Sequence, residues 1–163
     1  MDPSEITLLV VLIVFSAIFS GAEVSLVSVN LGKVKDLVKK KTYGAVALSK
    51  LKEHPHKMLS TILIGNNIVN VAAAAGATAA ATRLYGSEGV GIATGAVTLL
   101  LLVFGEVTPK SVAIQYAPSI ACFMAPPILF VSVILTPITW LLEQISMGIS
   151  RLLGKGQKQH KVT

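Results

Sequence analysis

Three short polar clusters interrupt stretches of the chain that are otherwise apolar. Each cluster combines side-chain oxygens with a glycine or a proline that can loosen a helix. A carboxylate inside a membrane costs about 2.5–3.5 kcal/mol on insertion scales, and amides without partners add to that cost. A cation would satisfy several such groups at once, so the clusters predict a cation site. They are Phe19-Ser20-Gly21-Ala22-Glu23, Gly65-Asn66-Asn67-Ile68-Val69-Asn70 and Phe104-Gly105-Glu106-Val107-Thr108-Pro109-Lys110.

The spacing within the second and third clusters indicates which oxygens could converge. Asn66 and Asn70 are four residues apart and share one helix face, whereas Asn67 lies about 100° round the helix from Asn66. Pro109 has no N–H to donate to the Gly105 carbonyl four residues back, so that oxygen is predicted to be free for a ligand. Hard oxygen ligands of this kind suit Mg²⁺ or Ca²⁺ rather than softer metals.

Each cluster also has a purely structural interpretation. The asparagines could form interhelical hydrogen bonds in a tight dimer. Glu106 could form an ion pair with Lys110 one turn later. Glu23, near the inner end of its apolar stretch, could face water or the neighbouring lysines. The occurrence of such clusters in three separate stretches favours the cation site.

Several other kinds of site are not expected. The three histidines lie outside the apolar stretches, and Cys122 is the single cysteine, so neither a zinc site nor a disulfide is predicted. The sequence contains no evident nucleophile–base pair and no phosphate-binding loop, so an enzyme is not predicted. The basic residues are expected to face a membrane surface, so nucleic acid is not expected as a partner.

The composition predicts a lipid environment for the elements that carry these clusters. The chain has 163 residues, of which 53% are hydrophobic and 13% charged, with a mean hydropathy of +0.73. A soluble domain carries about 25% charged residues. One all-α integral membrane domain is therefore expected over residues 1–163. The N-terminus carries no lysine or arginine before the first apolar stretch, so that stretch is read as retained rather than as a cleaved signal peptide.

Three membrane spans are predicted at about 6–29, 58–82 and 89–109, because about 20 apolar residues cross the hydrocarbon layer. The second half of the second span is built almost entirely from small residues, and the third begins with Gly91 and Gly95 four residues apart. Small residues let helices in lipid approach closely. This surface exceeds what one three-span bundle needs, so a homodimer is predicted.

Residues 30–57 differ from the spans because they carry eight of the 14 lysines and arginines. Apolar residues recur among the lysines at helical spacing. A pair of short amphipathic helices is predicted, broken at Thr42-Tyr43-Gly44 and lying against the anionic inner leaflet. The excess of lysine places this segment on the cytoplasmic side.

The last apolar stretch, about 118–150, is too short for two crossings and long for one. Pro126-Pro127 and Pro137 break it, and a juxtamembrane belt or re-entrant helix is predicted, hinged at Pro126-Pro127. Basic residues after it place the C-terminus in the cytoplasm, and three spans then place the N-terminus outside. A fourth, kinked span with the opposite orientation is the alternative. The basic residues are Arg151, Lys155, Lys158 and Lys161.

The three clusters and the lysine-rich helix pair together resemble the CorC/CNNM family, over essentially the whole chain. The resemblance implies a dimeric Mg²⁺-transporting transmembrane domain with three spans and a juxtamembrane belt helix. Family members carry cytoplasmic nucleotide-binding CBS domains after this domain, and none is expected within residues 1–163, so ATP binding is not carried over. The resemblance implies a cation-binding role for Ser20, Asn66, Asn70, Gly105 and Glu106, with Gly21 and Glu23 beside them.

Mg²⁺ transport across the cell membrane, through a dehydrated or partly dehydrated site in a homodimer, is therefore the leading hypothesis. A small ion-coupled multidrug exporter is one alternative, although aromatic residues to line a drug pocket are only 6% of the chain. A non-transporting membrane anchor or ion sensor is another. Neither the transport direction nor a coupling ion follows from the sequence.

Overall fold

The computed structural model describes residues 3–153, and nearly all of these residues are helical. An all-α membrane domain is thus confirmed. Its elements are α1 (Pro3–Ser28), α2 (Leu31–Lys39), α3 (Ala45–Glu53), α4 (Pro55–Leu100), a π-helical segment (Leu101–Val107), α5 (Thr108–Gln115), α6 (Ala117–Ile134) and α7 (Thr136–Leu153).

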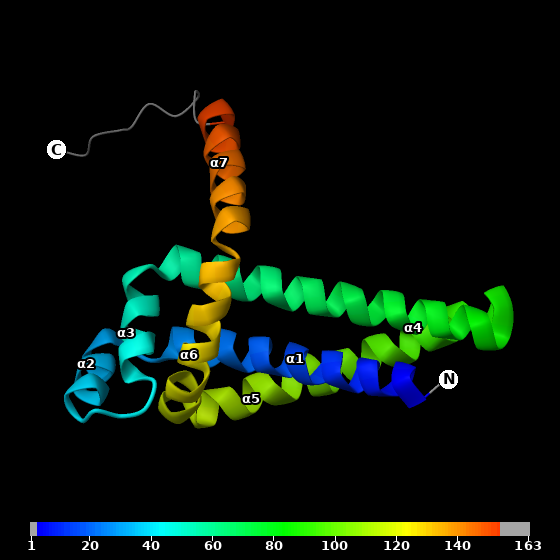
Figure 1. The fold of residues 1–163 in the computed structure, drawn as a ribbon, viewed down its shortest axis with the longest axis horizontal. Coiled ribbons are helices and arrows are strands. Elements are labelled where there is room, and N and C mark those ends of the chain that lie inside the picture. The colour runs from blue at the N-terminus through cyan, green and yellow to red at the C-terminus, as the bar shows by residue number, and fades with distance from the viewer. Residues whose placement is uncertain (1–2, 154–163) are drawn as a thin grey trace.

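The three predicted spans form a bundle. They correspond to Pro3–Ser28, Pro55–Arg83 and Gly89–Gln115, and Figure 1 shows them running alongside one another. The long helix α4 contains the second span and the first part of the third. Its chain reverses direction at Gly86, where φ is +64°. Such a φ is readily adopted only by glycine. The third span continues well beyond residue 109, where it was predicted to end.

Small side chains fill the middle of this bundle. Ala73, Ala77 and Ala80 lie three or four residues apart and are buried within the chain. The small-residue half of the second span therefore packs inside one molecule, at least along this face. At the end of the bundle away from α2 and α3, the Arg83 guanidinium forms an ion pair of 3.0 Å with Glu5 of α1.

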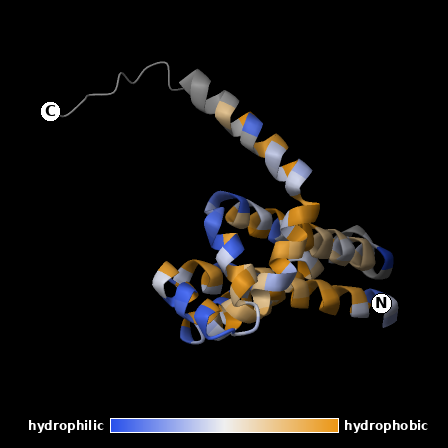
Figure 2. Ribbon diagram, turned by 60° about the vertical axis from the view of Figure 1, so that its left-hand side comes forward, coloured by the Kyte–Doolittle hydropathy of each residue, from blue (hydrophilic) through white to orange (hydrophobic). Residues whose placement is uncertain are grey.

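The lysine-rich segment forms two short helices, as predicted. The Asn30 side chain caps α2 by accepting a 2.8 Å hydrogen bond from the Lys33 backbone N–H. The predicted break between the helices is confirmed at residues 40–44. In Figure 2 the hydrophilic residues gather over α2 and α3, whereas hydrophobic residues cover most of the spans. Lys52 of α3 donates to the Val27 carbonyl at the end of α1 (3.2 Å), and burial lowers the pKa of this ammonium group.

The last apolar stretch consists of two helices, α6 and α7. α6 is long and apolar enough to count as a fourth candidate span by length and composition. Figure 1 shows, however, that α6 runs across α1 and α4 near the end of the bundle that carries α2 and α3, and that α7 projects away. This arrangement favours the belt helix over a fourth parallel span. Residues 154–163, which include most of the basic residues used to orient the C-terminus, lie outside the described part of the chain.

The predicted hinge at Pro126-Pro127 is wrong. α6 is helical through both prolines, and the break lies at Leu135, two residues before Pro137. Pro137 cannot donate to the carbonyl of Val133 four residues back, which helps to end α6 there.

The two prolines inside α6 instead mark the place where the turn between α2 and α3 docks. Pro126 cannot donate to the Cys122 carbonyl, so this oxygen lacks its usual helical partner. Gly44, at φ +72°, lies so close to that carbonyl that a Cβ atom added to it would overlap the oxygen. The prolines thus belong to a tightly packed contact rather than to a flexible joint.

The large apolar core lies at this same end of the molecule. Four fully buried side chains from four helices meet there, in a cluster that also includes Phe19, Val34 and Met58. The lysine-rich helices and α6 therefore form a folded unit around the ends of the spans. The four side chains are Leu26 of α1, Leu48 of α3, Ile62 of α4 and Ile128 of α6.

Candidate cation site

A buried hydroxyl, that of Ser16, connects the three spans. Its Oγ lies 2.8 Å from Asn70 Oδ1, 3.4 Å from Asn66 Oδ1 and 3.4 Å from the Gly105 carbonyl oxygen. Ser16 is fully buried and has a single hydroxyl proton. The single proton of Ser16 therefore faces three acceptor oxygens, and it cannot satisfy all of them.

Asn70 extends this cluster to the third span. Its Nδ2 donates a hydrogen bond of 3.1 Å to Glu106 Oε1, so its Oδ1 faces Ser16. Glu106 is half-buried, and among the described residues no ion pair involves it. The interpretation of Glu106 as the partner of Lys110 is therefore wrong for this structure.

Lys110 instead pairs with Glu23 of α1, with 3.2 Å between Nζ and Oε2. Both side chains are about one third exposed. Glu23 lies two turns after Ser16 along α1, and this ion pair joins α1 to α5. The carboxylate of Glu23 thus has the Lys110 ammonium group as its positively charged partner.

Two glycines allow the spans to approach closely enough for these contacts. A Cβ atom at Gly65 would overlap the ring of Phe19, which packs α1 against α4. A Cβ atom at Gly105 would lie 2.8 Å from Ser16 Oγ, closer than real Cβ contacts allow. Gly105 therefore permits the Ser16 hydroxyl to reach the backbone of the third span.

The third span is π-helical around Gly105 and Glu106. Thr108 N–H bonds to the Val103 carbonyl, five residues back, which is the π-helical pattern. Single π-turns inside α-helices often occur at functional sites. Helix continues through Pro109 to Gln115. Pro109 itself cannot donate to the Gly105 carbonyl, the oxygen that Ser16 contacts.

The structure distributes the remaining predicted residues over different environments. Ser20 is fully buried, and its Oγ has no hydrogen-bond partner among the described residues. Asn67 is exposed, on the face away from the cluster. A Cβ atom at Gly21 would lie 3.9 Å from the Pro109 carbonyl oxygen, so Gly21 provides packing space between α1 and α5.

Ser16 was not predicted from the sequence. A single serine in an apolar helix is uninformative, because its hydroxyl usually bonds to its own helix. The available signal was its position four residues before Ser20, which places both hydroxyls on one face of α1. That face carries Ser16 and Ser20 as buried polar side chains.

The assembled groups are suited to a hard cation. Ser16, Asn66, Asn70 and the Gly105 carbonyl supply neutral oxygens, and Glu106 supplies one negative charge. Ser20 adds a buried hydroxyl on the same face of α1. Within the described residues there is no cluster of three or more histidine, cysteine, aspartate or glutamate side chains. Neutral oxygen donors with one carboxylate resemble the ligand sets of Mg²⁺ and Ca²⁺ rather than those of softer metals.

The fold and the polar cluster define a multi-pass helical membrane domain with a polar centre between its spans. Residues 7–163 match the family described as the Cyclin M transmembrane N-terminal domain, CNNM. The chain therefore belongs to the CNNM family, the CorC/CNNM group of membrane transport proteins, and the resemblance seen in its motifs is confirmed.

Several relatives carry only provisional names. The chain is 39% identical over 147 residues to a UPF0053 protein of Haemophilus influenzae, covering 90% of this chain and 35% of the relative. It is 37% identical over 142 residues to a UPF0053 inner membrane protein of Escherichia coli (85% and 32%). A DUF21 domain-containing chloroplast protein of Arabidopsis thaliana is 40% identical over 157 residues (96% and 24%). The chain thus spans about a quarter to a third of the length of these relatives.

A more distant relative has a functional name. A polyamine export protein of Haemophilus influenzae is 28% identical over 157 residues, covering 88% of this chain and 36% of the relative.

Proposed function

We propose that this domain transports Mg²⁺ across the membrane through a site between its three spans. The observation that supports this proposal is the convergence of Ser16, Asn66, Asn70 and the Gly105 carbonyl around one hydroxyl proton, with Glu106 bonded to Asn70. Such an excess of acceptors, all of them buried or partly buried, is costly unless a donor or a cation satisfies it. A divalent cation in the cluster would satisfy all of them together.

The number and the charge of the donors suit transport of Mg²⁺. With Ser20 and one oxygen of Glu106, the groups offer six oxygens, and Mg²⁺ prefers octahedral oxygen coordination. Mg²⁺ gives up its water reluctantly, so a close set of protein oxygens would have to replace that water. The one carboxylate neutralises half of the ion's charge. Incomplete neutralisation keeps binding weak enough for release, as conduction requires.

A homodimer is part of the proposal. The third span has 11% of its most apolar window buried within the chain, against 28% for each of the other two spans. A Cβ atom added at Gly91 or Gly95 would meet no heavy atom within 4 Å. This face is therefore open for a second copy, and Gly95→Trp should weaken the dimer without disturbing the fold of one chain. Cross-linking in mild detergent that yields only monomer would overturn the dimer.

The proposed topology places the N-terminus outside and both α2–α3 and the C-terminus in the cytoplasm, because lysines concentrate in α2 and α3. A cysteine introduced at Lys40, in a chain whose Cys122 is replaced by serine, tests this orientation. An impermeant thiol reagent should label it only after the cells are opened. Labelling from outside intact cells would reverse the topology.

Polyamine export is the second candidate, since a relative bears that name. An organic polycation would need hydrogen-bond acceptors spread along an extended path, whereas the described acceptors gather around Ser16. A drug-type organic cation would in addition need aromatic walls. Both alternatives differ from Mg²⁺ transport in their substrate, and a flux measurement distinguishes them.

The test is flux into proteoliposomes that contain a Mg²⁺-sensitive dye, together with calorimetric titration using Ca²⁺, Na⁺ and spermidine as competitors. Mg²⁺ entry that Glu106→Ala abolishes, and that the exposed-site variant Asn67→Ala preserves, supports the proposal. Mg²⁺ binding without flux would indicate a sensor. Spermidine flux without Mg²⁺ flux would indicate an organic-cation exporter.

A further inference from the structure

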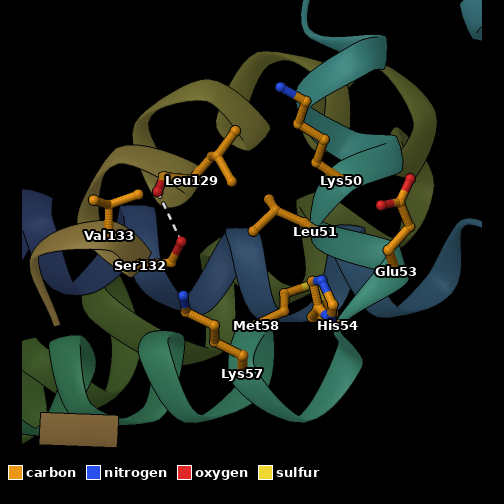
Figure 3. A pocket seen from close by; sticks show the side chains of 9 residues that line it. All are labelled: Lys50, Leu51, Glu53, His54, Lys57, Met58, Leu129, Ser132 and Val133. Atoms are coloured by element: carbon orange, nitrogen blue, oxygen red, sulfur yellow. Dashed lines mark hydrogen bonds between the residues drawn. The ribbon is translucent and has the colours of Figure 1, made fainter. Parts of the chain in front are cut away.

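A cleft separate from the cation site lies where the lysine-rich helices meet α6. It has a volume of about 310 Å³ and is open on one side. Figure 3 shows Lys57 extending toward Ser132, Lys50 extending from α3 on the opposite side, and Leu51 lying between them. The cleft therefore combines cationic groups with an apolar floor. Its lining residues are Lys50, Leu51, Glu53, His54, Lys57, Met58, Leu129, Ser132 and Val133.

The charge of the cleft is positive. Lys50 and Lys57 contribute two positive charges and Glu53 one negative charge. In Figure 3 the Glu53 carboxylate lies on the side of α3 away from Leu129. The Ser132 hydroxyl is bonded to the Leu129 carbonyl of its own helix (2.7 Å). The two ammonium groups are thus the principal charges that face the cleft.

The position of the cleft indicates an amphipathic occupant. The second span begins at Pro55, beside the cleft, and the apolar helix α6 ends at Ile134 on its other side. Next to the cleft, α6 exposes Phe130 (67%), Val133 (64%) and Ile134 (58%). A ligand there would meet lysines at one end and a lipid-facing apolar surface at the other.

We propose that this cleft binds an anionic phospholipid, with its head-group phosphate between Lys50 and Lys57 and an acyl chain along Leu129 and Val133. Ammonium groups bind phosphate as charge-assisted hydrogen-bond donors, and basic pockets beside membrane helices suit anionic head groups. A soluble phosphate would use the lysines but not the exposed apolar surface of α6. The lipid would join α3, α4 and α6 and thereby stabilise the helices that support the spans.

The test compares lipid binding by the whole protein using native mass spectrometry and melting in nanodiscs. Wild-type protein should bind phosphatidylglycerol in preference to phosphatidylcholine. Lys50→Gln/Lys57→Gln should weaken phosphatidylglycerol binding by about tenfold or more, given the contribution expected of each lysine near an anionic surface. The matched control, Lys35→Gln/Lys39→Gln, removes the same charge from exposed positions on α2 and should have a much smaller effect.

A second variant separates the cleft from general surface charge. Val133→Trp leaves every charge in place but fills the apolar side of the cleft, and it should also weaken phosphatidylglycerol binding. Equal losses in the Lys50/Lys57 and Lys35/Lys39 variants would overturn the proposal, as would unchanged binding in Val133→Trp. Glycerol phosphate that competes as well as the lipid would identify a soluble phosphate as the occupant and would equally overturn it.

Discussion

The side chain of Asn70 donates from Nδ2 to the carboxylate of Glu106 at 3.1 Å. Its other amide atom, Oδ1, therefore faces Ser16, at 2.8 Å. One asparagine thus connects the second span to both the first and the third. Because Nδ2 is bonded to Glu106, the amide oxygen of Asn70, rather than its NH₂ group, faces Ser16.

Asn70→Ala and Glu106→Ala should each abolish stabilisation by Mg²⁺. A ligand that binds only the folded state raises the free energy of unfolding by about 2.7 kcal/mol at a hundredfold excess over Kd. Both variants remove an oxygen from the cluster, so the Mg²⁺-dependent rise in melting temperature should disappear. Asn67→Ala is the control, because Asn67 is exposed on another face. Loss of the Mg²⁺ effect in the control would show that the ligand face is wrongly assigned.

Ser16→Ala should weaken Mg²⁺ binding and also destabilise the Mg²⁺-free protein. The substitution removes the donor to the partly buried Asn70 Oδ1, and an acceptor left without a partner costs up to about 1–3 kcal/mol when it is buried. Thermal melting with and without Mg²⁺ measures both effects. Ser25→Ala is the matched control on the same helix, since Ser25 is also fully buried but bonds only to the Ala22 carbonyl of α1. Similar results for the two variants would exclude a special role for Ser16.

Glu23→Gln should leave the affinity for Mg²⁺ within about twofold. Its carboxylate is paired with Lys110, and such partly exposed ion pairs contribute about 0–1 kcal/mol to stability. Calorimetric titration with Mg²⁺ measures the affinity, and Lys110→Gln should behave in the same way. If Glu23→Gln lost Mg²⁺ binding as completely as Glu106→Ala, Glu23 would be a ligand, as the motif suggested.

Much of the architecture was predictable because it follows from hydropathy and periodicity. The positions of the three spans and the break between α2 and α3 depend on local composition, and both were predicted, although the third span continues to Gln115 rather than ending at 109. The helical spacing of the asparagines likewise predicted that Asn66 and Asn70 would face inward and Asn67 outward. These features depend on neighbours in the sequence.

Features that depend on contacts between distant residues were not predictable. Lys110 follows Glu106 by four residues, and helical spacing alone therefore favoured Glu106 over Glu23, which lies on α1. Pro126 suggested a hinge because proline usually breaks helices. The packing of Gly44 against the Cys122 carbonyl, which involves residues 78 positions apart, cannot be derived from local rules. Ser16 was missed for the same reason.

Gly44→Ala should destabilise the protein substantially. Residues other than glycine pay about 1–2 kcal/mol for left-handed backbone, and the new Cβ would also overlap the Cys122 carbonyl. A loss above about 2 kcal/mol is expected, measured as a lower melting temperature in detergent. Gly32→Ala is the control, because Gly32 lies within α2 and its Cβ would meet only Asn30 Oδ1 at 3.4 Å. A melting temperature unchanged in Gly44→Ala would contradict the tight packing of the turn on α6.

Pro109→Ala should affect the stability of the protein and its affinity for Mg²⁺ differently. Alanine restores an N–H that can donate to the Gly105 carbonyl, and it keeps the Cβ atom on the side of Gly21. The carbonyl would then be drawn into the backbone hydrogen bonding of its own helix and away from Ser16 and any cation.

The Mg²⁺-free Pro109→Ala protein should therefore be no less stable than the wild type, while its affinity for Mg²⁺ should fall. The two changes in opposite directions are the informative result, since a proline with only a structural role would affect stability alone. Pro118→Ala is the control. It also removes a proline near the start of a helix, α6, but at a position outside the cation site. Melting without Mg²⁺ and calorimetric titration with Mg²⁺ measure the two quantities. Wild-type affinity in Pro109→Ala would show that the Gly105 carbonyl does not need the proline to serve as a ligand.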